Sequence, residues 1–227
     1  MQAIIFDMDD TLYPERNFVF SGFLAVSVWA EAHLGIMAED AFAELWKYFV
    51  DGVRGNTFDL WLEGRGFRPE TYRDDLVKIY RTHKPSLTPF REVPPLLESL
   101  KGRFKLALLA DGYLDVQRRK LRALAIAHYL EVVVFSDAFG RGSWKPSTRP
   151  FECVLSELGI APDVAVYVGD NPLKDFYGAK QLGMFTIQLN TPTGEYCHLT
   201  PPSVQHAADK VCNSFSDLRK LLIDKGT

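Results

Sequence analysis

The sequence has little cysteine, no long apolar run and no excess of basic residues. Its three cysteines, Cys153, Cys197 and Cys212, are too widely spaced for a disulfide framework or a zinc site. The most apolar segment, residues 18–32, is interrupted by polar residues and glycine and is too short to span a bilayer. We therefore expect a protein of the reducing cytoplasm that makes no contact with a membrane.

The charge balance also excludes classes of partner. The formal net charge is −3, so nothing favours binding to nucleic acid or to an anionic surface. The first apolar run begins almost at Met1, which leaves no room for a signal peptide before it. The five histidines show no metal-binding spacing; they are His33, His83, His128, His198 and His206.

The apolar content is 47% over 227 residues, enough for one large domain or for a core domain with an insertion. Ile4 to Phe6 reads as a strand buried on both faces. After Pro89, short apolar strands alternate with helices, which predicts an α/β fold with a doubly wound parallel sheet. The predicted strands are 104–109, 132–135, 164–168, 185–189 and 211–212, and the predicted helices are 93–100, 114–124, 150–158, 173–182 and one capped by Ser214.

Residues 14–89 contain no strand pattern and read as helices separated by turns. Helices are predicted over 18–34, 38–50 and 58–63, with another that begins at Pro69. The Phe and Trp side chains at helical spacing indicate a bundle core rather than a ligand cage. The predicted organisation is a core of residues 1–13 and 90–227 with a helical insertion at 14–89. In the helix 114–124, the Arg and Lys residues are expected on the outer face.

Acidic residues follow the first strand at once. Asp7 and Asp9 come directly after Phe6, at the end of the strand where open α/β sheets place their ligands. Two carboxylates two residues apart point the same way in an extended segment, and their repulsion is relieved by a divalent metal or by a shared proton. A solvated turn is the competing interpretation of these residues alone.

Other polar residues follow other predicted strands. Asp111 and Gly112 come after 104–109, Lys145 after 132–135, and Asp170 with Asp175 after 164–168. Each is a weak signal by itself, since a glycine–aspartate pair or a loop lysine is commonly solvated. Because the carboxyl ends of parallel strands meet at one edge of the sheet, we expect all of them to converge on Asp7.

With these motifs in order, the whole chain resembles the haloacid dehalogenase superfamily, a group of mostly magnesium-dependent phosphatases. The first motif matches Asp7-Met8-Asp9-Asp10-Thr11, the lysine motif matches Lys145, and the last acidic motif matches Gly169-Asp170 with Asp175. The resemblance implies a Rossmann-like core, with the helical insertion acting as a cap. It also implies a phosphoric monoester hydrolase with Mg²⁺ as cofactor and a small phosphorylated metabolite as substrate, working as a monomer or a homodimer.

The resemblance also implies residue roles. Asp7 is expected to attack phosphorus and form an aspartyl-phosphate, and Asp9 to protonate the leaving oxygen and then activate water. Lys145 is expected to offset the charge of the phosphate and of Asp7. The implied phosphate-binding residues are Thr11, Asp111, Gly112 and Lys145. The implied magnesium ligands are Asp7, Asp9 through its main-chain carbonyl, and Asp170, with Asp175 either a further ligand or just outside the coordination shell.

Two positions depart from the family pattern. Ala110 stands where the second motif normally has a Ser or Thr hydroxyl, so one hydrogen-bond donor to phosphate is missing. A neutral hydrogen bond is worth about 0.5–1.5 kcal/mol, and up to about 3 kcal/mol at a charged group, so we expect a handicap rather than loss of activity. Asp10 replaces a common glycine and is expected to be tolerated.

Other activities are weighed against this one. A dehalogenase needs neither an acid–base carboxylate nor a magnesium cluster, so Asp9, Asp170 and Asp175 argue against it. A phosphomutase shares the core residues and needs a cap that traps a bisphosphate. A catalytically weak protein that binds a phosphorylated ligand is the non-enzyme alternative, supported by Ala110 alone. In the insertion, Arg16, Arg54 and Asn56 either face the site or are solvated surface groups.

Overall fold

The computed structural model describes residues 1–224, which form two compact units. The first unit combines Met1–Glu15 with the chain from Leu87 onward, and the second is Arg16–Ser86. Among residues 1–224, no helix has both the length and the apolar character needed to cross a membrane.

The first unit is built on a six-stranded, all-parallel sheet with the strand order β3-β2-β1-β4-β5-β6. Strand β1 therefore lies between β2 and β4, where the direction of winding reverses, and such a reversal is where open α/β sheets bind ligands. This confirms the predicted α/β doubly wound sheet. The strands are β1 (Ala3–Phe6), β2 (Lys105–Ala110), β3 (Val132–Phe135), β4 (Ala165–Gly169), β5 (Phe185–Leu189) and β6 (Lys210–Cys212).

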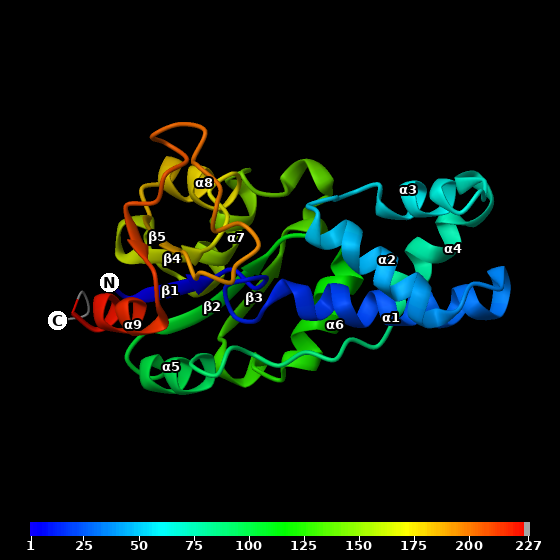
Figure 1. The fold of residues 1–227 in the computed structure, drawn as a ribbon. Coiled ribbons are helices and arrows are strands. Elements are labelled where there is room, and N and C mark those ends of the chain that lie inside the picture. The colour runs from blue at the N-terminus through cyan, green and yellow to red at the C-terminus, as the bar shows by residue number, and fades with distance from the viewer. Residues whose placement is uncertain (225–227) are drawn as a thin grey trace. The chain divides into compact units, whose positions relative to one another are not determined.

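Helices cover both faces of this sheet, with α7 and α8 on one side and α5 and α9 on the other (Figure 1). One apolar cluster joins Ile5 and Tyr167 of the sheet to Phe151 of α7 and Phe176 of α8, all of them buried. The helices of this unit are α5 (Val93–Leu100), α6 (Leu114–Leu124), α7 (Arg149–Leu158), α8 (Asp175–Gln181) and α9 (Phe215–Asp224). Short 3₁₀ turns lie at Ala127–Tyr129, Ser136–Phe139, Arg141–Ser143 and Pro162–Val164.

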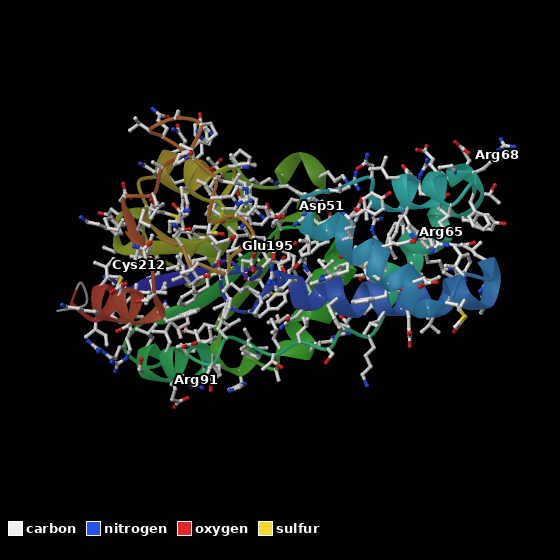
Figure 2. All side chains as sticks on the ribbon, viewed as in Figure 1. Asp51, Arg65, Arg68, Arg91, Glu195 and Cys212 are labelled. Atoms are coloured by element: carbon white, nitrogen blue, oxygen red, sulfur yellow. The ribbon has the colours of Figure 1, made fainter. Side chains whose placement is uncertain are left out.

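The second unit is helical, and it contains α1 from its second residue on, α2, α3 and α4. Their bounds are α1 (Glu15–Leu34), α2 (Ala38–Val50), α3 (Thr57–Gly64) and α4 (Pro69–Thr82). Phe49 and Trp61 are buried beside Leu45 in its apolar core, so these two aromatic residues pack as a bundle core, as predicted. At the surface, Arg65 (Figure 2) donates to both carboxylate oxygens of Glu44, at 2.8 and 2.7 Å.

The ends of some strands and helices differ from the prediction. Strand β2 starts and ends one residue later than predicted, so Ala110 is its last residue. Helix α8 begins at Asp175 rather than near Leu173, because the Asn171 side chain accepts the Leu173 N–H at 2.9 Å and forms a turn. The predicted cap at Ser214 is confirmed, since its Oγ accepts the Asp217 N–H at 3.1 Å.

Candidate active site

The carboxyl ends of β1 and β4 place two carboxylates side by side. Asp7 directly follows β1, and its backbone N–H donates to the carbonyl of Val168 in β4 at 2.8 Å. Asp170 directly follows β4. Gly169 at the end of β4 is required by packing, because an added Cβ would lie 2.7 Å from Oδ2 of Asp175. The predicted convergence at this edge is therefore present for these acidic residues.

Lys145 joins this group from the segment before α7. Its buried Nζ donates to Oδ1 of Asp7 at 2.6 Å, to Oδ1 of Asp175 at 2.6 Å and to the Tyr167 hydroxyl at 2.8 Å. An ammonium has three N–H donors, so these three acceptors fix its position fully. The backbone N–H of Lys145 also donates to Oδ1 of Asp111 at 3.2 Å, which ties the lysine segment to the loop after β2.

Asp7, Asp170 and Asp175 form a buried cluster whose nearest carboxylate oxygens lie within 4.8 Å of one another. Oδ2 of Asp7 and Oδ2 of Asp170 are buried and have no hydrogen-bond partner among residues 1–224. Both oxygens of Asp175 are engaged, Oδ1 with Lys145 and Oδ2 with the N–H groups of Asp170 and Asn171 at 3.2 and 2.8 Å. Two buried carboxylate oxygens without hydrogen-bond donors suit a hard divalent cation. Asp175 stabilises the loop that carries Asp170 through its hydrogen bonds to the backbone.

The pKa values of the cluster reflect burial and the balance of nearby charges. Burial, partly offset by Lys145, raises the pKa of Asp7 to about 6. Burial and the charges of Asp175 and Asp7 raise the pKa of Asp170 well above its usual range. The pKa of Asp175 is lowered, because Lys145 and Lys174 outweigh the effect of its burial. A bound cation would favour the ionised form of all three carboxylates.

The carboxylate of Asp9 is not part of this cluster. Both of its oxygens accept from Nζ of Lys120 in α6, at 2.7 and 2.9 Å, and Oδ1 also accepts from the Tyr13 hydroxyl. Burial would raise the pKa of Asp9, but the ion pair and hydrogen bond with Lys120 outweigh it and lower the pKa. The prediction that the lysine of α6 lies on the outer face is wrong, since Lys120 is only 4% exposed.

Asp10 has a structural role that the sequence did not indicate. It adopts a left-handed conformation with φ of 51° and is buried. Its Oδ1 accepts the N–H of Glu15, and its Oδ2 accepts the N–H of Glu195, both at 2.9 Å. Glu195, labelled in Figure 2, lies in the long segment after β5. The side chain thus ties the loop after β1 to residues far along the chain, which explains why an aspartate fits here in place of glycine.

The remaining predicted phosphate-binding residues lie in loops after β1 and β2. Thr11 is buried, and its Oγ1 has no hydrogen-bond partner in the described part of the chain. Gly112 has φ of +116°, and an added Cβ there would lie 2.4 Å from Nε2 of Gln117. Ala110 is buried, with no side-chain donor to offer. In the second unit, Arg16, Arg54 and Asn56 are exposed.

Three residues around the site were missed from the sequence: Tyr13, Lys120 and Tyr167. Lys120 lies four residues after the buried Val116, so helical spacing alone could have placed it on the inner face of α6. Tyr167 is hidden in an apolar strand, where alternation with its neighbours carries no signal. Its contact with Lys145 spans 22 residues of sequence and becomes visible only in the fold.

Comparisons with known proteins agree with this arrangement. The family described as haloacid dehalogenase-like hydrolase matches residues 4–189. A glyceraldehyde 3-phosphate phosphatase from Methanopyrus kandleri is 32% identical over 209 residues, which cover 88% of this chain and 88% of that protein. A phosphoserine phosphatase from Thermus thermophilus is 34% identical over 174 residues, covering 71% and 67%. The crystal structure of a HAD phosphatase from Thermococcus onnurineus superimposes with a TM-score of 0.65 at 25% identity, covering 98% of each chain.

Proposed function

The chain belongs to the haloacid dehalogenase-like hydrolases, and from that premise we propose that it hydrolyses phosphate monoesters of small metabolites with Asp7 as nucleophile and Mg²⁺ as cofactor. The observation that carries the proposal is the buried cluster in which Lys145 bridges Asp7 and Asp175 beside Asp170. Burying such charged groups is costly, and buried groups with perturbed pKa values gather at functional sites.

Mg²⁺ is the cofactor that these residues favour. The unpartnered Oδ2 atoms of Asp7 and Asp170 are hard oxygen ligands, and the main-chain carbonyl of Asp9 is the proposed third ligand. When bound, Mg²⁺ would neutralise negative charge so that an anionic phosphate can approach the anionic nucleophile. Asp175 is proposed to act from outside the coordination shell, by holding Lys145 and the backbone of Asp170.

In the first step, an oxygen of Asp7 attacks phosphorus and the bond from phosphorus to the leaving oxygen breaks. For this step Asp9 must first take up a proton, against the lowering of its pKa by Lys120. It then gives that proton to the leaving oxygen, so the product leaves as an alcohol and an aspartyl-phosphate remains. Lys145 balances the charge shared by Asp7 and the phosphate. The N–H groups of Asp111 and Gly112, with the hydroxyl of Thr11, are the proposed donors to the phosphate oxygens.

In the second step, water attacks the phosphorus of the aspartyl-phosphate. Asp9 now accepts a proton from that water, the bond between phosphorus and Asp7 breaks, and inorganic phosphate is released. The same carboxylate therefore serves as acid and then as base.

The substrate class follows from the relatives. Those reported above are named for glyceraldehyde 3-phosphate and for phosphoserine, both small phosphorylated metabolites. One specific observation favours a second candidate, a weak catalyst that binds a phosphorylated ligand: Ala110 supplies no hydroxyl at the end of β2. A phosphomutase has no observation of its own in its favour, and the acidic cluster argues against a dehalogenase.

A panel of about one hundred phosphorylated metabolites, assayed for phosphate release with Mg²⁺ and with EDTA, tests the proposal. We expect turnover of at least one small ester that EDTA abolishes and Mg²⁺ restores. Turnover that survives full chelation contradicts the metal requirement. The lack of any turnover across the panel favours the binding protein instead.

We also propose that Arg16–Ser86 acts as a cap that closes during the reaction and excludes water. The support is its position in the sequence, directly after the loop that carries Asp7 and Asp9. Hydrogen exchange near Glu15 and Leu87, with and without beryllium fluoride, measures this, and unchanged protection at both junctions contradicts it.

A further inference from the structure

Helix α6 carries a lysine on its apolar face. The buried residues of this helix are Val116, Gln117, Lys120, Leu121 and Leu124, and Lys120 is the charged one among them. Burying an ammonium is unfavourable unless a counter-charge and hydrogen bonds compensate. The compensation comes from Asp9, whose side chain is itself only 15% exposed.

The contact between these two groups fixes the orientation of a carboxylate. Nζ of Lys120 lies 2.7 Å from Oδ1 and 2.9 Å from Oδ2 of Asp9, so it donates to both oxygens. A donor shared by both oxygens resists rotation of the carboxylate about its last bond. Among the hydrogen bonds described, Oδ1 accepts a second one from Tyr13, which leaves Oδ2 with more remaining acceptor capacity.

We propose that Lys120 is a positioning residue for Asp9, which holds the acid–base carboxylate so that Oδ2 exchanges protons with the leaving group and with water. This inference rests on the proposed function, because Asp9 needs this orientation only if it transfers protons. Lys120 acts through Asp9 and not on the phosphate, whose charge is balanced by Lys145, bonded to Asp7.

The alternative is that Lys120 only holds α6 against the sheet. Lys120 also acts electrostatically on Glu15. If Lys120 has only one of these structural roles, its removal should lower stability. Any loss of activity should then be the same whether or not Asp9 is present. A positioning role predicts that the loss requires Asp9 to be present, and this difference can be measured with a double-mutant cycle.

The variants are Lys120→Met, Lys120→Arg, Asp9→Asn and the double variant Lys120→Met/Asp9→Asn. Arg119→Met, on the exposed face of the same helix, is the matched control. Thermal unfolding is measured first for each, and Lys120→Gln replaces Lys120→Met throughout if the methionine variant does not fold. The assays use p-nitrophenyl phosphate, an aryl ester with a good leaving group, and glycerol 3-phosphate, an alkyl ester with a poor one.

We expect Lys120→Met to lower kcat about 10- to 100-fold with KM little changed, as for a misplaced catalytic group. The loss should be larger on the alkyl ester, because its leaving oxygen depends more on protonation. Lys120→Arg should retain more of kcat than Lys120→Met, because it keeps a charged donor. In the Asp9→Asn background, Lys120→Met should change kcat by no more than about twofold.

A wild-type kcat for Lys120→Met overturns the inference, as does an equal fold-loss in the Asp9→Asn background. Both results leave the proposed function standing, since the wild-type protein still turns over substrate. If the wild-type protein releases no phosphate from any ester, the proposed function fails and the inference fails with it.

Discussion

The carboxylate of Asp175 accepts hydrogen bonds from three donors, so Asp175→Asn tests how the site is built. Its Oδ1 accepts from Lys145 at 2.6 Å, and its Oδ2 accepts from the N–H groups of Asp170 and Asn171 at 3.2 and 2.8 Å. Asparagine has one acceptor oxygen, so its NH₂ group must face either the ammonium or the two amides. The substitution therefore breaks a buried ion pair and sets donors against donors.

Removing one partner of a buried ion pair costs about 3–5 kcal/mol. Part of this cost is offset in the variant. The negative charge of Asp175 repels Asp7 and Asp170 and raises the pKa of both, and the substitution removes this repulsion. We therefore expect the free energy of unfolding to fall by about 3 kcal/mol. For a unit of this size, that corresponds to a decrease in Tm of about 6–12 °C.

The assay is thermal unfolding in EDTA at several pH values. The pKa of Asp175 is lowered in the folded protein, so its stabilisation is present above its unfolded pKa and is lost as the pH falls through the lower folded value. The difference between wild type and variant should be largest near about pH 5. It should shrink below about pH 4, where Asp175 takes up a proton, and above about pH 6, where Asp7 ionises against the charge of Asp175 in the wild type. Asp163→Asn, at an exposed position, is the control. A variant within about 0.5 kcal/mol of wild type at pH 7 refutes the reasoning.

Three further predictions follow from the same geometry. Burial, partly offset by Lys145, raises the pKa of Asp7 from 3.8 to about 6. The stabilisation of the metal-free protein by protonated Asp7 is therefore complete below pH 3.8 and is lost as the pH rises through about 6. Unfolding in EDTA across this range checks it, and Mg²⁺ should restore stability at neutral pH; a flat profile contradicts it. Gly112→Ala should lower kcat/KM, because φ of Gly112 is +116° and the added Cβ would lie 2.4 Å from Gln117. The control Gly142→Ala should leave kcat/KM unchanged, because a Cβ there would meet no described atom within 4 Å. Equal rates for the two variants count against a role of Gly112 in phosphate binding. Ala110→Thr should raise kcat/KM on a simple ester by about 3- to 100-fold, the value of one hydrogen bond to a charged group, and no change on any ester shows that the missing hydroxyl is not limiting.

The sheet and its order of elements could be predicted because the signals are local. Short apolar runs such as Val132–Phe135 and Phe185–Leu189 coincide with β3 and β5. The acidic cluster was also within reach, since Asp7 and Asp170 directly follow strands whose carboxyl ends must share an edge.

The side chains that contact Asp9 and Asp10 could not be predicted from the sequence. Lys120 and Asp9 lie 111 residues apart, and only the packing of α6 brings the ammonium to the carboxylate. The charge of Lys120 suggested a solvated face, but tertiary contacts overrode that tendency. The contact between Asp10 and Glu195 spans 185 residues and depends on an irregular segment whose path has no periodic signal.

Phosphate release by the wild-type protein and by Asp7→Asn, measured side by side in Mg²⁺, tests the central claim most directly. The claim is that Asp7 is the nucleophile of a phosphate ester hydrolase. It predicts turnover of a small phosphate ester by the wild-type protein and a decrease of about a thousandfold or more in the variant, which keeps nearly the same shape but lacks the attacking oxygen anion. Equal rates for the two proteins would contradict the claim.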